Sequence, residues 1–350
     1  MSGLGSVWLL AVFVASAAVI WYAGVRLSDS TDVLAERLHL GSAFGGLILL
    51  AIATNLPEIA ITISAAVAGQ LDVAVGNILG GIAIQTVVLA ALDAAGVRPR
   101  KPLTYLAASL VLVLEGALVV AVLAVVVMGT QLPADLNYAR LSPAALVIVV
   151  LWLVGLVLLN RAGSGLSWQE GGDAPDTQEG ERGHSKGIKE RTAASTGKVA
   201  AVFTAAALAT LVAGVVIERS GETLFSRWGM SGVVFGATVL AAATSLPELS
   251  TGLTSTRMAD YQLAISDIFG GNAFLPVLFF PAALITGRPV LPAAHRTDIY
   301  LTALAIVLTL IYMAGLVFRP QRQQLRMGID SRAAIVIYIA GIIGLTTIGT

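Results

Sequence analysis

Apolar stretches of about 20 residues recur along almost the whole chain, and this pattern limits the fold more than any other feature. A helix of that length crosses the ~30 Å hydrocarbon core of a bilayer. Only 12% of the residues are charged, whereas soluble domains carry about 25%. The sequence therefore predicts an all-α polytopic membrane protein in a lipid bilayer. We expect ten transmembrane helices, at roughly 5–27, 40–68, 71–96, 103–129, 142–161, 198–218, 229–257, 262–287, 297–318 and 332–349.

Composition removes several classes of function. The formal net charge is +0, so no nucleic-acid partner is indicated. The chain has no cysteine, which excludes disulfides, thiolate metal sites and thiol catalysis. Motifs of the types HExxH and GxSxG are absent, and the three histidines (His39, His184 and His295) fall in loops or at span ends. We expect neither an enzyme nor a cofactor, and nothing in the sequence implies an oligomer.

The polar segment 162–197 divides the chain into two parts, 1–161 and 198–350. It is rich in glycine and in charges of both signs, as a solvated linker is. The first apolar run is longer than a signal-peptide core, so we expect it to remain as a span. Sixteen of the 21 Lys and Arg residues lie on the side of the linker. Because cytoplasmic loops carry the excess of positive charge, the linker is predicted to be cytoplasmic and both termini outside the cell membrane.

A hexamer of the form Ala-Thr-x-Leu-Pro-Glu occurs twice, at 53–58 and at 243–248. The two copies lie 190 positions apart, and the same offset aligns 46–85 with 236–275 without a gap. We place the repeated segments at about 41–90 and 231–280. The repeat unit has five spans, an odd number, so the second half should be inverted relative to the first. Many secondary transporters are built from two such inverted repeats, with the ion site where broken helices meet.

Each hexamer combines a helix-breaking proline with a carboxylate at membrane depth. Pro57 and Pro247 lack the N–H group of a helix interior and free carbonyl oxygens one turn earlier. Glu58 and Glu248 are costly in a bilayer unless they serve a function. Oxygens from carboxylates, carbonyls and hydroxyls are what hard cations such as Ca²⁺ bind. The alternative is a pair of protonated glutamates that hydrogen-bond within the bundle. Further side-chain oxygens come from Thr54, Asn55, Thr244 and Ser245.

The span after each hexamer adds polar residues to the predicted site. Asn77 and Gln85 fall about 80° apart on one helix and two turns apart along it, so both can face one cavity. Asp267 occupies the position equivalent to Asn77 and is a candidate ligand or proton carrier. Glu115 has no counterpart in the second half, and a transport role and a structural role remain equally open for it.

The two repeats resemble those of the cation/Ca²⁺ antiporter superfamily, in particular the membrane region of prokaryotic sodium/calcium exchangers. The resemblance implies that Glu58 and Glu248 are the central Ca²⁺ ligands, and that Thr54 and Thr244 donate carbonyl and hydroxyl oxygens. Asn55 and Ser245 fall at serine positions of the family. The second part of the family pattern is not kept here. Gly81 and Gly271 stand where the family has serine, and Leu275 stands at the last polar position of the pattern.

These observations predict a secondary active antiporter that exchanges Ca²⁺, or a related cation, for Na⁺ or H⁺ by alternating access. By analogy with the family, the first and sixth spans should slide to switch access. The alternative is a passive cation channel or a non-transporting scaffold on a degenerate exchanger fold, which the lost serines and Leu275 suggest.

Overall fold

The fold is taken from a computed structural model of the chain. It describes residues 3–37, 46–97, 101–133, 135–136, 142–163, 165, 167, 195–230 and 232–348. Within these ranges the secondary structure is helical, apart from one isolated bridge between Gln324 and Met327. The prediction of an all-α membrane protein is confirmed. The linker residues 168–194, with His184, and the loop residue His39 lie outside the described residues.

The helices before the linker follow the predicted spans. Their bounds are α1 (Ser6–Arg37), α2 (Gly46–Thr54), α3 (Leu56–Val67), α4 (Leu71–Gly96), α5 (Leu103–Leu106), α6 (Leu110–Thr130) and α7 (Pro143–Gly163).

The helices after the linker repeat this order with more interruptions. Their bounds are α9 (Thr196–Arg227), α10 (Gly232–Phe235), the π-helical η2 (Gly236–Leu240), α11 (Ala241–Thr244), α12 (Leu246–Arg257), α13 (Tyr261–Phe274), the 3-10 turn η3 (Leu275–Leu278), α14 (Phe279–Thr286), the 3-10 turn η4 (Leu291–Ala293), α15 (Arg296–Phe318) and α16 (Ile329–Ile348).

Among the described residues, eight helical segments are long and apolar enough to cross a membrane. The other two predicted spans are the interrupted helices, α2–α3 and α10–α12. This arrangement is consistent with ten spans. Two predicted boundaries were wrong: α1 and α9 are each 32 residues long and continue to Arg37 and Arg227, rather than ending at 27 and 218. Apolar character ends at the first charged residues, but charged side chains at a water-facing helix end do not stop a helix.

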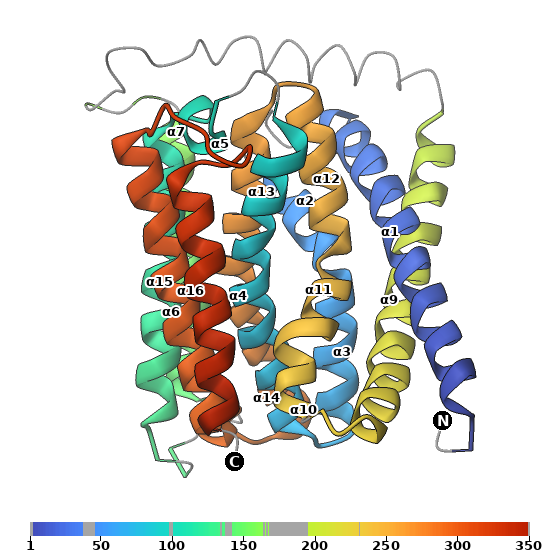
Figure 1. Cartoon of the computed structure of the whole chain (residues 1–350). Helices are drawn as coiled ribbons and strands as arrows, with labels where there is room; N and C mark the ends of the chain where they lie inside the picture. Colours follow the sequence, from blue (N-terminus) through green and yellow to red (C-terminus); the bar gives the residue numbers. More distant parts are fainter. Residues whose placement is uncertain are drawn as a thin grey trace.

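The two interrupted helices run in opposite directions through the bundle (Figure 1). In that view, α2 lies above α3, whereas α10 lies below α11 and α12. The chain therefore passes downward through the first break and upward through the second. The start of α1 and the end of α16 lie at the same end of the bundle.

The most buried apolar side chains surround α4, which lies among α12, α13, α15 and α16. Ile78, Leu79 and Ile82 of α4 are fully buried there. In contrast, α7 leaves Val150 and Leu153 about half exposed on its outer face. Apolar residues outside and a packed interior are the pattern expected of a bundle surrounded by lipid.

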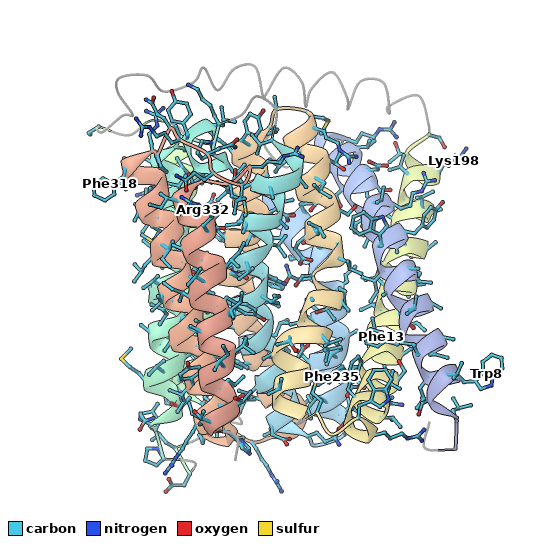
Figure 2. The ribbon with its side chains drawn as sticks, in the orientation of Figure 1. Trp8, Phe13, Lys198, Phe235, Phe318 and Arg332 are labelled. Carbon is cyan, nitrogen blue, oxygen red and sulfur yellow. The ribbon has the colours of Figure 1, made fainter. Side chains whose placement is uncertain are left out.

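Helices α1 and α9 form a pair beside this bundle (Figure 1). Phe13, Phe225 and Phe235 join the pair to α10 near one end, with ring centroids 5.7 Å apart for Phe13–Phe225 and 5.1 Å for Phe225–Phe235. Figure 2 shows Phe13 and Phe235 close together there, while Trp8 and Phe318 point away from the bundle. The pair therefore contacts the interrupted helices along one face only.

Candidate cation site

Both interrupted helices break one residue before Leu-Pro-Glu. Helix α2 ends at Thr54 and α3 begins at Leu56, while α11 ends at Thr244 and α12 begins at Leu246. The residues at the two breaks have nearly the same backbone angles, φ −84° and ψ 15° at Asn55 against φ −81° and ψ 8° at Ser245. The proline in each following first turn explains the break, since it cannot donate to the preceding turn. The carbonyl ends of α2 and α11 thus face the same region as the first turns of α3 and α12, an arrangement that favours bound cations.

The two glutamates lie close together in the centre of the bundle. Glu58 and Glu248 are both fully buried. The side-chain nitrogen of Gln85 lies 3.3 Å from Oε1 of Glu58 and 3.4 Å from Oε1 of Glu248. The same nitrogen donates to Oδ1 of Asn55 at 3.1 Å. A single amide from α4 therefore joins the carboxylates of the two repeats.

The hydroxyl groups cross between the repeats in the same way. The Thr54 hydroxyl lies 3.4 Å from Oδ1 of Asp267, although it also donates to carbonyl oxygens of its own helix. Thr54 also interacts with the carboxyl group of Glu248, and Thr244 with that of Glu58. Asp267 receives a further hydrogen bond, of 2.5 Å, from the Thr251 hydroxyl. Each repeat thus contributes hydroxyls to the acids of the other.

Several buried oxygens at this centre have no hydrogen-bond partner within the described residues. An unsatisfied buried acceptor costs about 1–3 kcal/mol, so a group of them needs an explanation. Carboxylate and amide oxygens are ligands for hard cations, and a bound cation would satisfy them. The atoms are Oε2 of Glu58, Oε2 of Glu248, Oε1 of Gln85 and Oδ1 of Asn272.

The two positions where glycine replaces the family serine are not equivalent. A Cβ atom placed on Gly271 would lie 2.6 Å from Nδ2 of Asn55, which donates to the Ala51 carbonyl at 2.7 Å. The Asn55 side chain therefore fills the space that a side chain at position 271 would need. A Cβ atom on Gly81 would meet nothing within 4 Å. The space beside Gly271 is thus filled by the Asn55 amide, whereas the space beside Gly81 is open.

A cavity of about 310 Å³ lies next to this centre. It is lined by carboxylates from three helices: Asp72 of α4, Glu218 and Glu222 of α9, and Asp298 of α15. Asn77 lies in its wall and donates to the Glu58 carbonyl at 3.2 Å and to the Thr62 hydroxyl at 3.1 Å. Negative charge on the wall of this cavity would raise the local concentration of cations. It opens at the end of the bundle where α4 and α15 begin.

The structure brings most of the predicted site residues to one place, all of them buried except the partly exposed Asn77. Ser245 is the least connected, because its hydroxyl donates to Ala241 of its own helix at 2.7 Å. The described residues hold no cluster of three or more His, Cys, Asp or Glu side chains arranged to bind a metal. Carboxylates, amides and hydroxyls together therefore make up the centre.

Two contributors were missed in the sequence. Thr251 follows Glu248 by one helical turn, a spacing that could have indicated it. Asn272 donates to the Thr86 hydroxyl at 3.1 Å. The family pattern has an asparagine at this position, which is kept at Asn272 and replaced by Ile82 in the other repeat.

Comparison with known proteins agrees with this arrangement. YrbG, an inner membrane protein of Escherichia coli K12, is 28% identical over 292 residues, covering 82% of this chain and 83% of that protein. CaxA of Alkalimonas amylolytica, named as a proposed antiporter, is 28% identical over 302 residues and is covered over 88% of its length, for 86% of this chain. These similarities place the chain among multi-pass cell-membrane proteins.

Solved structures share the fold. The H⁺/Ca²⁺ exchanger CAX superposes with a TM-score of 0.66 at 13% identity, covering 97% of this chain and 87% of CAX. The sodium-calcium exchanger NCX_Mj gives 0.60 at 16% identity, covering 97% and 99%. The sequence pattern of the family described as sodium/calcium exchanger protein matches residues 8–161 and 198–346, which is most of the chain. The chain therefore belongs to the sodium/calcium exchanger protein family and is a membrane exchanger of cations.

Proposed function

We propose that this exchanger carries Ca²⁺ in one direction and Na⁺ or H⁺ in the other. The observation that supports it most is the pairing of Glu58 with Glu248 through Gln85, with one oxygen of each carboxylate left unpartnered. Two buried carboxylates match the charge of one divalent cation. When Ca²⁺ leaves, monovalent cations must replace it, because two bare buried carboxylates repel each other.

The proposed ligands come from both repeats, in two halves that we take as 1–161 and 198–350. Glu58 and Glu248 bind Ca²⁺ directly, and Gln85 adds its amide oxygen. Thr54 and Thr244 contribute oxygens to the centre, next to Asn55 and Ser245. Asp267 and Asn77 serve the flanking positions where the counter-ions bind. Asp267 is an acid and Asn77 is a neutral amide. The two flanking positions therefore differ in the charge that they offer to a counter-ion.

We also propose the orientation of the protein in the membrane. Both termini lie outside and the linker 162–197 lies in the cytoplasm. The excess of Lys and Arg on the linker side supports this orientation. Lys198 and Arg332 lie at the end of the bundle opposite to the start of α1 (Figure 2). With this orientation, the acidic cavity at Asn77 opens to the outside, and a switch of access would open the centre to the cytoplasm.

Flux measurements in proteoliposomes test the function. Vesicles that contain the purified chain are loaded with Ca²⁺, and efflux is followed under an inward Na⁺ gradient, an inward pH gradient, or neither. Efflux that depends on one of the gradients supports exchange and identifies the counter-ion. Efflux that is equal in all three conditions would instead indicate a channel.

Variants connect the flux to the proposed centre. Glu58→Gln and Glu248→Gln keep the side-chain shape but remove one charge each, and either should abolish exchange. Asp135→Asn removes an exposed carboxylate in the loop after α6 and should leave the flux unchanged. Normal flux in the Glu58→Gln/Glu248→Gln double variant would refute the assignment of the site.

A further inference from the structure

Glu115 is a further carboxylate at membrane depth, separate from Glu58, Glu248 and Asp267. It lies near the start of α6, and the repeat offset aligns it with Ala305, so it breaks the symmetry of the halves. Its side chain is 7% exposed. Oε1 accepts a hydrogen bond of 2.8 Å from the hydroxyl of Ser266 on α13. Oε2 is buried and has no hydrogen-bond partner within the described residues.

The Glu115 carboxyl group lines a cavity of about 50 Å³ between α2, α6, α7 and α13. Among the described residues of its wall, Glu115 and Ser266 are those with side-chain oxygens, and none is a lysine or arginine. Its remaining lining is apolar and includes Leu118, Trp152 and Phe269. A carboxylate without a cationic partner in such surroundings is costly. It must therefore be neutralised, either by a proton or by a metal cation.

The number of oxygens distinguishes these two possibilities. The cavity offers the two oxygens of Glu115 and the hydroxyl of Ser266 as side-chain ligands. Hard metal cations take about six or more oxygens. The cavity has too few side-chain oxygens to surround Ca²⁺ or Na⁺ by itself, whereas one carboxyl group is sufficient to hold a proton.

The cavity shares residues with the cation centre. Ser266 directly precedes Asp267, whose carboxylate receives hydrogen bonds from Thr54 and Thr251. Ala51 lines the cavity, and its carbonyl oxygen accepts hydrogen bonds from both Thr54 and Asn55. Ser266 and Ala51 therefore link the cation centre to the wall of the cavity, so a change of charge or position at the centre can alter the surroundings of Glu115.

Other ionisable groups near α6 face elsewhere. On α13, Asp267 is turned toward Thr54 and Thr251. On α15, the Tyr312 hydroxyl donates to Ser331 at 3.4 Å. The residues of α2 and α7 that line the cavity carry no ionisable side chain. Within the described residues, the charged groups linked to Glu115 by these contacts are thus those of the cation centre.

We propose that Glu115 is a proton-binding site, distinct from the cation centre, that releases its proton when a cation binds at that centre. This inference depends on the proposed function, because it needs a cation at Glu58, Glu248 and Asp267. The sign follows from electrostatics: positive charge added to an empty centre favours the ionised form of a carboxyl group linked to it. When the cation leaves, Glu115 takes up a proton again. Glu115 on α6 then takes up and releases one proton in each transport cycle.

Infrared difference spectroscopy of the purified full-length chain tests the proposal directly. The carbonyl stretch of a protonated carboxyl group is recorded as the pH is varied without Ca²⁺, and again after Ca²⁺ is added at constant pH. We expect one protonated-carboxyl band to be lost in Glu115→Gln and to be kept in the control Asp135→Asn. Ser266→Ala should shift the position of this band without removing it, since it removes the hydrogen bond and keeps the carboxyl group. Ca²⁺ should decrease the band in the wild-type protein.

The outcomes separate the proton site from the proposed function. If Glu115→Gln titrates like the wild type, no proton site exists at Glu115 and the inference is wrong. If the band is present but does not respond when Ca²⁺ demonstrably binds, the linkage is wrong. If Na⁺ still removes the band at constant pH in the Glu58→Gln/Glu248→Gln variant, in which the centre is disabled, the cavity at Glu115 holds Na⁺ instead. If the wild type does not bind Ca²⁺, the proposed function fails, while the pH titration still decides whether Glu115 binds a proton.

Discussion

Gly24 of α1 lies directly against Pro247 of α12: a Cβ atom placed on Gly24 would be 2.8 Å from the Pro247 Cα atom. The equivalent contact exists in the other half, where a Cβ atom on Gly214 of α9 would be 3.0 Å from the Pro57 Cα atom. Gly24 and Gly214 are separated by the same 190 positions as the hexamers. Each long helix thus touches the broken helix of the opposite repeat at its proline.

These contacts predict that Gly24→Ala and Gly214→Ala impair transport more than they impair cation binding. The added methyl group meets backbone atoms that cannot rotate away, and overpacking of this kind costs about 1–3 kcal/mol. If α1 and α9 slide past the broken helices, the methyl group also obstructs that movement. Flux in proteoliposomes and Ca²⁺ binding in detergent are compared for each variant.

The matched control is Gly197→Ala. Gly197 lies in the first turn of α9, where a Cβ atom would meet nothing within 4 Å. This variant should transport like the wild type. Equal flux in Gly24→Ala and in the control would show that the close contact does not limit the transport cycle.

Gln85→Leu should weaken Ca²⁺ binding. Leucine has a similar volume and occupies the equivalent position in the second repeat, at Leu275. It removes the amide that contacts both glutamates and the unpartnered oxygen Oε1. Losing these interactions should cost about 1–3 kcal/mol, which corresponds to roughly a 5- to 150-fold weaker affinity. Titration calorimetry measures the affinity, with Gln131→Leu, at a helix end away from the centre, as the control. An unchanged affinity would mean that Gln85 is not a ligand.

Gly81→Ser and Gly271→Ser should differ although the two positions are equivalent in the repeats. The serine at 81 enters open space, so thermal stability should stay close to that of the wild type. The serine at 271 displaces the Asn55 amide from the Ala51 carbonyl, at a cost of about 1–3 kcal/mol.

The double variant Asn55→Ser/Gly271→Ser tests the cause of this loss. Removing the longer amide makes room at position 271, so the double variant should be more stable than Gly271→Ser alone. A double-mutant cycle from thermal unfolding gives the interaction energy between the two positions. If the effects are additive, the Asn55 side chain does not determine why position 271 is glycine.

The sequence was sufficient for the class of fold, the positions of the interrupted helices and the burial of two glutamates beside the breaks, because these depend on local signals. Apolar length identifies a span, and proline beside a buried acid identifies a break. The pairing of Gly24 with Pro247 lies outside the aligned window 46–85, and only packing between the halves reveals it. The fit of Asn55 against Gly271 is likewise a contact between the two repeats. Such contacts depend on how the halves meet, which no local pattern specifies.

Asp267→Asn should change the number of counter-ions carried per Ca²⁺. Asp267, beside the pair Glu58 and Glu248, is a third buried acid, one more than Ca²⁺ alone neutralises. Asparagine keeps an oxygen that can accept the Thr251 hydrogen bond, and it copies the residue of the other repeat, Asn77. Removing one charge should therefore lower the number of monovalent cations exchanged per Ca²⁺ by about one, without preventing Ca²⁺ binding. The ratio is derived from the balance point, which is the counter-ion gradient at which a known Ca²⁺ gradient produces no net flux. Asp72→Asn removes a carboxylate from the wall of the acidic cavity and should slow the flux while leaving this balance point unchanged. If Asp267→Asn keeps the wild-type balance point, Asp267 does not carry a counter-ion, and its role is limited to orienting Thr54 and Thr251.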